Sequence, residues 1–227
     1  MGLNKTNGNM YPWVTHTWNP LAGRCKHDCS YCYMKRSFLG SLKKYDGEIR
    51  LFEEEMNTDL GSGKTIFVGS ATDIFGDWVP ASIIKKILRY CGDFPNIYLF
   101  QSKNPRRFAE FLELMPKGSI IGTTLETNRD YNVSKAPNPA QRYQDFLSIK
   151  YPRKMISIEP IQDFDLEEFL MWIKKINPLF VSIGADSKNN SLHEPSSNKI
   201  KKLIKGIEDI TEIRVKKNLK RILGRGY

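Results

Sequence analysis

The sequence has no long hydrophobic run. No stretch approaches the roughly 18 consecutive apolar residues that a membrane-spanning helix needs. Residues 1–10 are polar and rich in Gly and Asn, without the apolar core of a secretory signal peptide. Low-complexity tracts and internal repeats are also absent. We therefore expect a cytoplasmic protein without a membrane partner, in a reducing compartment where cysteine thiols stay available.

Cysteine is scarce, and its placement excludes a disulfide-stabilised secreted fold. Four cysteines occur in 227 residues, and three of them lie within residues 25–32. The fourth, Cys91, shares helical spacing with Ile84, Ile87 and Leu88, which predicts a buried small hydrophobic residue. The length and the hydrophobic content of 40% suit one domain, residues 1–227, with a sizeable core.

Short β-branched runs alternate with amphipathic helical patterns along the chain. This alternation is typical of a parallel sheet with crossover helices. The predicted strands are residues 13–17, 65–69, 96–101, 119–124, 154–159, 180–184 and 212–215. The predicted helices are residues 51–60, 81–91, 105–115, a segment that includes 143–147, 166–176 and 200–207. Six or seven βα units predict an α/β fold, a parallel (β/α)6-7 partial TIM barrel.

The three clustered cysteines form the pattern C-x3-C-x2-C. Cys25, Cys29 and Cys32 are the thiols, and the aromatic Tyr31 precedes the last of them. Three thiolates this close can ligate three irons of a cubane cluster and leave the fourth iron open. The alternative is a structural zinc site with His27 or His16 as fourth ligand. Such zinc sites more often use two separated C-x2-C pairs, and the sequence has no second pair.

Polar residues follow the predicted strands. Crossovers of one hand bring the carboxyl ends of parallel strands to one edge, where active-site loops gather. Together these residues supply a carboxylate for an amino group, a cation for a carboxylate and hydroxyls for a ribose. The strand-end residues are Ser70, Thr72, Asp73, Ser102, Lys103, Thr124, Glu126, Glu159, Ala185, Asp186 and Ser187.

The cysteine run resembles the signature of the radical S-adenosylmethionine superfamily. Residues 17–20, 68–75, 102–105, 158–160 and 182–184 are similar to a small subgroup, the phage Gp37/Gp68-like or three-cysteine-motif family. The Gly-Ser-x-Thr-Asp piece and Lys103 also resemble spore photoproduct lyase, a radical enzyme that repairs a DNA lesion.

The resemblance implies a role for each matching residue. Cys25, Cys29 and Cys32 would be the catalytic and metal residues, ligating three irons of a [4Fe-4S] cluster whose fourth iron binds S-adenosyl-L-methionine. The other implied cofactor-binding residues are Tyr31 and Ala185 for the adenine, Ser70, Thr72 and Asp73 for the ammonium, Lys103 for the carboxylate, Thr124 and Glu126 for the ribose, and Glu159. Ser70, Thr72 and Asp73 occupy the positions where the superfamily has its Gly-Gly-Glu motif, which binds the amino group of methionine.

The resemblance also implies an activity and a partner. The reduced cluster would cleave S-adenosylmethionine into methionine and a 5′-deoxyadenosyl radical, which abstracts a hydrogen atom from the substrate. A reductant such as flavodoxin or ferredoxin would supply the electron. We expect a monomer with one cluster.

The charge of the chain points to a polyanionic substrate. The net charge is +10, and the basic segment 199–227 carries ten Lys and Arg against three Asp and Glu. This concentration predicts a DNA or RNA substrate, with a base or nucleotide as the reacting group. Two alternatives stay open: the same chemistry on a peptide or small metabolite, or a zinc-stabilised nucleic-acid-binding module without catalysis.

Overall fold

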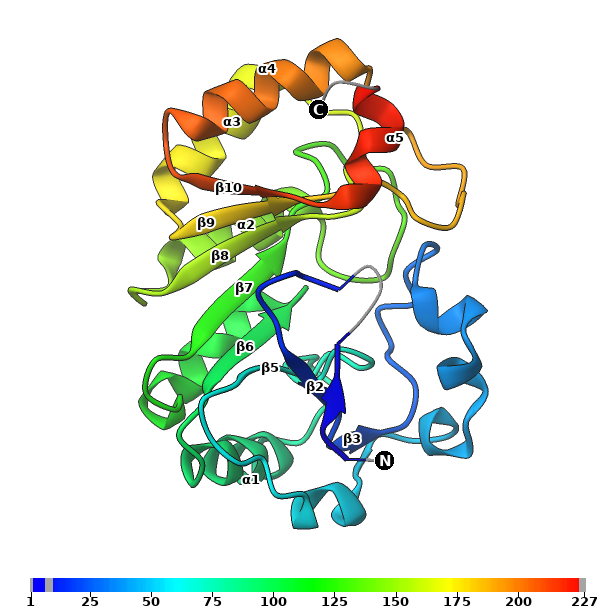
Figure 1. Cartoon of the computed structure of the whole chain (residues 1–227), viewed down its shortest axis with the longest axis vertical. Coiled ribbons are helices and arrows are strands. Elements are labelled where there is room, and N and C mark those ends of the chain that lie inside the picture. The colour runs from blue at the N-terminus through cyan, green and yellow to red at the C-terminus, as the bar shows by residue number, and fades with distance from the viewer. Residues whose placement is uncertain (1, 7–9, 225–227) are drawn as a thin grey trace.

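A mostly parallel sheet forms the centre of the protein (Figure 1). The computed structural model describes residues 2–6 and 10–224, and within these residues the central sheet has eight strands. In spatial order they are β1 (Asn4–Lys5), β2 (His16–Trp18), β5 (Thr65–Val68), β6 (Ile97–Ser102), β7 (Ile120–Thr124), β8 (Lys154–Ile158), β9 (Phe180–Ile183) and β10 (Glu212–Val215). Only β1 runs antiparallel to its neighbour. The predicted α/β class with a parallel sheet is confirmed.

Helices connect the parallel strands. The α-helices are α1 (Ala81–Gly92), α2 (Pro139–Ser148), α3 (Leu166–Ile176), α4 (Ser197–Glu208) and α5 (Lys220–Leu223). The 3-10 helices are η1 (Tyr33–Arg36), η2 (Phe38–Ser41), η3 (Lys43–Tyr45), η4 (Glu53–Asn57), η5 (Pro105–Leu114) and η6 (Lys217–Leu219). A small second sheet pairs β3 (Leu21–Ala22) with β4 (Arg50–Leu51). None of the described helices is long and apolar enough to cross a membrane.

Two sequence predictions need correction. The strand predicted at 13–17 begins only at His16, because the residues before it turn inward to fill the sheet's inner face. The helix predicted at 51–60 is wrong: the segment forms the end of β4 and the short helix η4. Tertiary partners hold it there, since Glu55 forms a buried ion pair with Lys44 at 3.0 Å and its carbonyl accepts a hydrogen bond from Trp18 Nε1.

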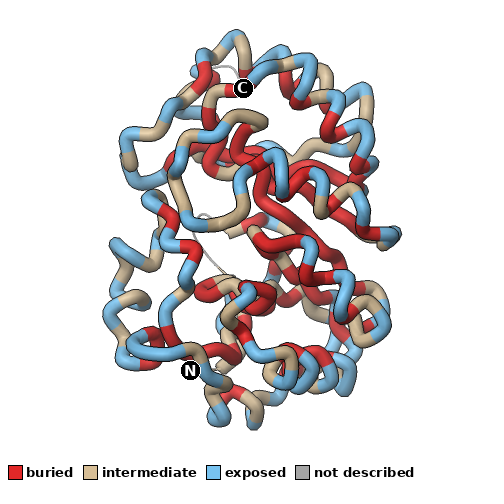
Figure 2. The backbone as a smooth tube through the Cα atoms, turned by 180° about the vertical axis from the view of Figure 1, so that it is seen from behind, coloured by how far each residue is buried: buried red, intermediate tan, exposed pale blue. Residues whose placement is uncertain are grey.

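The two faces of the sheet bury two separate clusters. Val68, Phe100 and Ile158 belong to the large core, which also contains the buried faces of the helices. Figure 2 shows the buried positions concentrated along the central strands. The alternating residues point inward at the amino ends of the strands and pack against the N-terminal segment. This inner cluster consists of Tyr11, Val14, Leu99, Ile120, Met155 and Phe180. The N-terminal segment therefore closes the sheet's inner face at one end.

The inner face becomes polar toward the carboxyl ends of the same strands. Two residues beyond Leu99 and Met155 come Gln101 and Ser157. Both meet the Tyr11 hydroxyl, which donates to Gln101 Oε1 at 2.9 Å and lies 2.7 Å from Ser157 Oγ. Tyr11 thus marks the boundary between the apolar filling and a polar cavity.

Candidate functional site

A cavity of about 840 Å³ lies at the carboxyl ends of the strands. Its lining comes from the N-terminal segment, the cysteine loop (residues 23–32), the segment 33–45 and the ends of β5 to β10. A volume of this size is near the upper end of the range for small-molecule and cofactor sites, about 300–1,000 Å³. Polar residues of the sheet's inner face surround its floor.

The cysteine loop lies at this edge of the sheet. All three of its thiols are free, and Cys29 and Cys32 line the cavity, whereas Cys25 lies beside it. Backbone hydrogen bonds from Ser30 N to Val133 O (2.8 Å) and from Lys135 N to the carbonyl of the loop's histidine (2.7 Å) join it to the loop after β7. Burial raises the pKa of Cys25 to about 12, which is the ordinary consequence of desolvating a thiolate.

Asp73 anchors the cysteine loop to the sheet. Its Oδ2 atom lies 2.8 Å from His27 Nε2 and accepts hydrogen bonds from Ser102 Oγ and Lys103 N, each 2.9 Å long. Its Oδ1 atom accepts from Phe75 N at 2.9 Å. Burial by itself would raise the pKa of Asp73, but His27 and the backbone amides outweigh burial and hold that pKa below its usual range. This carboxylate connects the ends of β5 and β6 with the cysteine loop.

Replacing Asp73 by alanine is expected to loosen the cysteine loop while the sheet stays folded. Buried His27 and Ser102 would lose their acceptor, at a cost of about 1–3 kcal/mol for each unsatisfied group. Limited proteolysis and hydrogen exchange at residues 23–32 measure the effect. Asp93→Ala, at an exposed helix end, serves as the control, and equal protection in both variants would contradict the anchoring role.

Four side chains form a charged network at the cavity floor. Glu126 Oε1 accepts from both the Tyr31 hydroxyl and Lys103 Nζ, and Lys103 Nζ also contacts the Tyr31 hydroxyl. On the other side, Arg142 Nη2 lies 2.8 Å from Glu126 Oε2 as an ion pair. Burial would raise the pKa of Glu126, but Arg142 and Lys103 hold it well below its usual range. The result is a buried, ionised carboxylate that fixes the lysine and the tyrosine.

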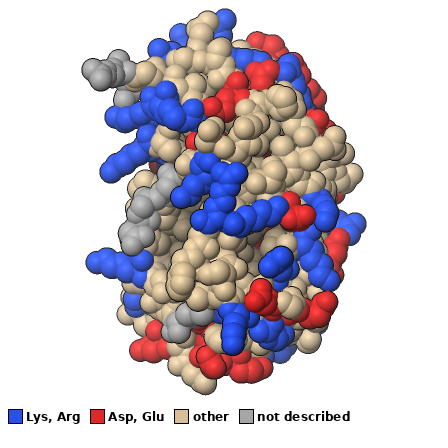
Figure 3. All heavy atoms as spheres, turned by 90° about the vertical axis from the view of Figure 1, so that its right-hand side faces the viewer, with Lys and Arg blue, Asp and Glu red and all other residues tan. Residues whose placement is uncertain are grey.

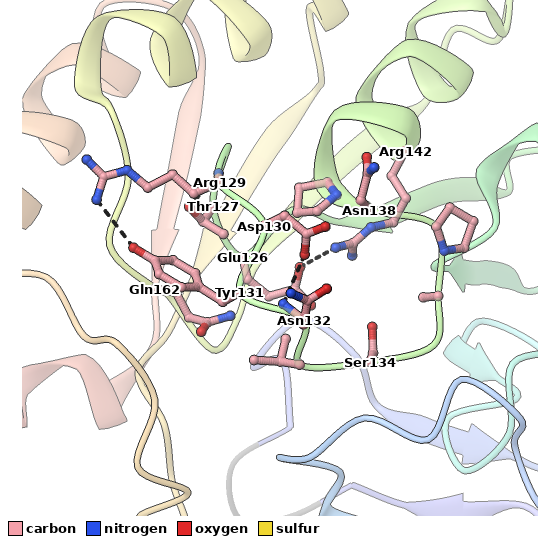
Figure 4. Close-up of a pocket in the computed structure, with 14 residues that line it drawn as sticks. Glu126, Thr127, Arg129, Asp130, Tyr131, Asn132, Ser134, Asn138, Arg142 and Gln162 are labelled. Atoms are coloured by element: carbon pink, nitrogen blue, oxygen red, sulfur yellow. Dashed lines mark hydrogen bonds and ion pairs between the residues drawn. The ribbon is translucent and has the colours of Figure 1, made fainter.

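A small polar pocket of about 80 Å³ lies behind this network (Figure 4). Glu126 and Arg142 form one wall, and the loop of residues 127–139 forms the rest. Gln162 is buried there, and neither its amide nitrogen nor its amide oxygen has a partner among the described residues.

A second polar group lies at the ends of β8, β9 and β10. Lys216 Nζ is 2.8 Å from Glu159 Oε2, and Asn218 Nδ2 donates to Ala185 O at 2.6 Å. Lys216 also lies over the Tyr11 ring, 4.9 Å from its centre. The C-terminal segment therefore contributes directly to the cavity wall.

The structure brings most of the predicted site residues together. Eight of them line the large cavity: Cys29, Tyr31, Cys32, Ser70, Lys103, Thr124, Glu159 and Ala185. Four lie outside this lining: Cys25, Thr72, Asp73 and Glu126. Thr72 is buried and donates to Gly23 O at 3.3 Å, so like Asp73 it supports the cysteine loop. Glu126 acts on the cavity through Lys103 and Tyr31.

Sequence reasoning missed several residues of the site. Arg142 stands beside Tyr143 in an amphipathic helix, where an arginine usually faces solvent, but its side chain is buried against Glu126. Lys216 is the first residue after β10. The rule that strand-end residues face the site could therefore have identified it. Tyr11 gave no signal, because it lies outside every predicted element, whereas Gln101 is the last residue of the predicted strand 96–101, directly before Ser102 and Lys103.

The three free thiols of the cysteine loop form a donor set that fits an iron–sulfur cluster. Zinc needs four ligands around one point. His27 Nε2 is bound to Asp73, whereas His27 Nδ1 has no hydrogen-bond partner among the described residues, and His16 Nδ1 contacts Thr15 Oγ1. A cubane instead places each thiolate on a different iron. Cys91 is fully buried in the core, so it cannot join the loop as a fourth thiol ligand.

The fold and the cavity define an α/β protein with a three-thiol loop at the carboxyl edge of a parallel sheet. The chain belongs to the family described as "Protein of unknown function (DUF5131)", whose model matches residues 9–208. No curated protein matches it. Among solved structures, a cysteine-to-serine mutant of spore photoproduct lyase is similar in fold, with a TM-score of 0.61. The two are 12% identical, and the match covers 92% of this chain and 78% of that one.

Proposed function

We propose that this protein is a radical S-adenosylmethionine enzyme. The observation that carries the proposal is the position of three free thiols on one loop, without a fourth thiol nearby: two of them, Cys29 and Cys32, line a cavity large enough for a cofactor. The fold likeness to spore photoproduct lyase supports it. The parallel strands β2 and β5 to β10 follow one another in chain order across the sheet, which supports a partial TIM barrel with its active site at the carboxyl edge.

Different residues of the chain would bind the cluster and the cofactor. Cys25, Cys29 and Cys32 would hold a [4Fe-4S] cluster. With S-adenosylmethionine bound, such a cluster would supply the chemistry of radical hydrogen abstraction. Lys103, held by Glu126, would pair with the carboxylate of the cofactor, and the remaining cavity residues would orient its ammonium, ribose and adenine groups.

The cavity would also keep the reacting groups apart from water. The N-terminal segment closes the far end of the inner face, with Tyr11 and Val14 buried there. The acidic side chains Glu55 and Glu159 are paired with Lys44 and Lys216, so they present less negative charge to an anionic ligand. Exclusion of water and of stray hydrogen donors is what radical chemistry requires of the protein.

We further propose a nucleic acid base or nucleotide as the substrate, flavodoxin or ferredoxin as the reductant, and a cytoplasmic monomer. The net charge of +10 supports a polyanionic partner. Part of the basic segment 199–227 borders the cavity through Lys216, although its last three residues lie outside the described part of the chain.

Lys103→Ala tests the cofactor assignment. We expect it to weaken S-adenosylmethionine binding by about tenfold to a hundredfold. The carboxylate of the cofactor would lose its charged partner Lys103, a side chain that is largely buried. Isothermal titration calorimetry of the reconstituted protein measures the affinity, and iron analysis checks that the cluster is retained. Lys174→Ala, on the exposed face of α3, is the matched control. Equal affinity in the two variants would refute the assignment.

A further inference from the structure

The segment 33–45 exposes apolar side chains to solvent. Phe38 is 80% exposed, Leu39 45% and Tyr33 39%. Two short 3-10 helices, η1 and η2, carry these residues just after the cysteine loop, and η3 follows them (Figure 1). Exposing an aromatic ring to this extent has no benefit for folding, so the ring is available to a ligand.

This segment forms part of the rim of the large cavity. Tyr33 and Leu39 line the cavity, and the Tyr33 hydroxyl donates to Ser70 O at 3.2 Å. Arg36 Nη1 donates to Lys188 O at 2.7 Å, which joins the segment to the loop after β9. Phe38 is therefore held beside the opening by contacts on both sides of it.

The rim is positively charged. The segment 33–45 contains four Lys and Arg and no Asp or Glu, and two of the four, Lys35 and Lys44, form ion pairs with Asp28 and Glu55. Arg36 and Lys43 are exposed on it, and Lys188 is exposed on the neighbouring loop and also lines the cavity. Figure 3 shows the face on which this segment and α5 lie, with Lys and Arg side chains spread across it. A ligand at this rim would therefore meet cations around an apolar ring.

We propose that the segment 33–45 binds a single-stranded stretch of nucleic acid next to the cavity. One base stacks on Phe38, the phosphates follow Arg36, Lys43 and Lys188, and the adjoining base enters the cavity. Base stacking on aromatic side chains combined with a basic track is the common mode of single-strand binding. This inference rests on the proposed function and assigns the surface that selects its substrate.

The combination of groups favours nucleic acid over a protein partner. Protein interfaces depend on a desolvated apolar centre from which charges, and lysine in particular, are depleted. Here the apolar ring stands among cations within a few residues of the chain, and every described acidic residue of the cavity lining has a bonded partner. A polyanion with flat rings matches both features at once.

Fluorescence anisotropy with the full chain tests the stacking contact. Labelled oligonucleotides of about 20 nucleotides, longer than the ~4–16 that one site covers, serve as single-stranded DNA, single-stranded RNA and duplex probes. Phe38→Ala is expected to weaken single-strand binding about tenfold to a hundredfold, and Phe38→Trp to keep it. Met171→Ala, which removes an exposed apolar side chain on α3, should change nothing.

The basic track is tested by salt dependence. Replacing Arg36, Lys43 and Lys188 together by glutamine should lower the slope of log affinity against log salt by about 2, or about 0.7 for each phosphate. The double variant Lys174→Gln, Lys175→Gln on α3 is the control with unchanged slope.

The outcomes separate this inference from the proposed function. Single-strand affinity that is unchanged in Phe38→Ala, binding that is confined to the duplex, or binding of a protein instead of nucleic acid would overturn the inference. S-adenosylmethionine binding and cleavage without substrate depend on the cysteines and Lys103 and would persist in that case. A protein that binds the strand through Phe38 but has no iron would overturn the function and support the inference.

Discussion

Replacement of Cys29 by alanine is expected to remove the iron–sulfur cluster entirely. After anaerobic reconstitution, the unaltered protein should contain about four irons and four sulfides per chain, because three thiolates and one open iron complete a cubane. Cys29 is the buried member of the three and lies between the other two in the sequence. We expect the variant to lose the colour, the iron and the sulfide together.

Cys91→Ala is the matched control for this experiment. The Cys91 thiol is fully buried among apolar residues of α1, so its loss should leave the iron and sulfide content unchanged. Iron and acid-labile sulfide assays with visible absorption spectra provide the measurement. Stoichiometric zinc without sulfide in the unaltered protein would contradict the cluster assignment.

Glu126→Gln is expected to cause the largest loss of stability in the site. Glu126 and Arg142 are both buried, and neutralising one partner leaves an uncompensated buried charge, which costs about 3–5 kcal/mol. Lys103 loses its anionic partner at the same time, and the amide oxygen of glutamine is left as a neutral acceptor for Lys103 and Tyr31. Denaturant unfolding measures the change, with Glu167→Gln on the exposed side of α3 as control. A loss below about 1 kcal/mol would show that the network does not stabilise the fold.

The pH dependence of unfolding checks the same network. The pKa of Glu126 is held below its ordinary value of 4.5 in the folded protein. The unfolded chain therefore takes up a proton first, and the stability that Glu126 contributes is present above pH 4.5 and is lost as the pH falls below that value. The difference in unfolding free energy between the unaltered protein and Glu126→Gln should shrink on acidification through this range.

Much of the fold could be predicted because its strands have a clear sequence pattern. Residues 65–69, 119–124 and 154–159 are short β-branched runs between amphipathic helices, and β5, β7 and β8 coincide with them to within one residue at each end. The prediction failed at residues 51–60, where the pairing of Glu55 with Lys44 decides the local structure. An ion pair between two single residues of different segments leaves no periodic signal in the sequence.

The candidate site was predictable only where position along a strand implies proximity. Ser70, Lys103 and Glu159 follow three different strands and do line one cavity, as the rule for parallel sheets requires. The charged network was not predictable, because Arg142 reaches Glu126 from a helix whose sequence gives no sign of a buried cation. Similarly, the closure of the inner face by Tyr11 depends on the path of the N-terminal segment, which no local pattern encodes.

The most direct test of the central claim is the cleavage of S-adenosylmethionine by the reconstituted protein. The full chain, loaded anaerobically with iron and sulfide and reduced with dithionite, is incubated with the cofactor, and 5′-deoxyadenosine and methionine are quantified. We predict that both products form, that Cys29→Ala and Cys32→Ala form neither, and that Cys91→Ala forms both. A fully loaded protein that binds S-adenosylmethionine and releases no 5′-deoxyadenosine above the level of Cys29→Ala would contradict the account.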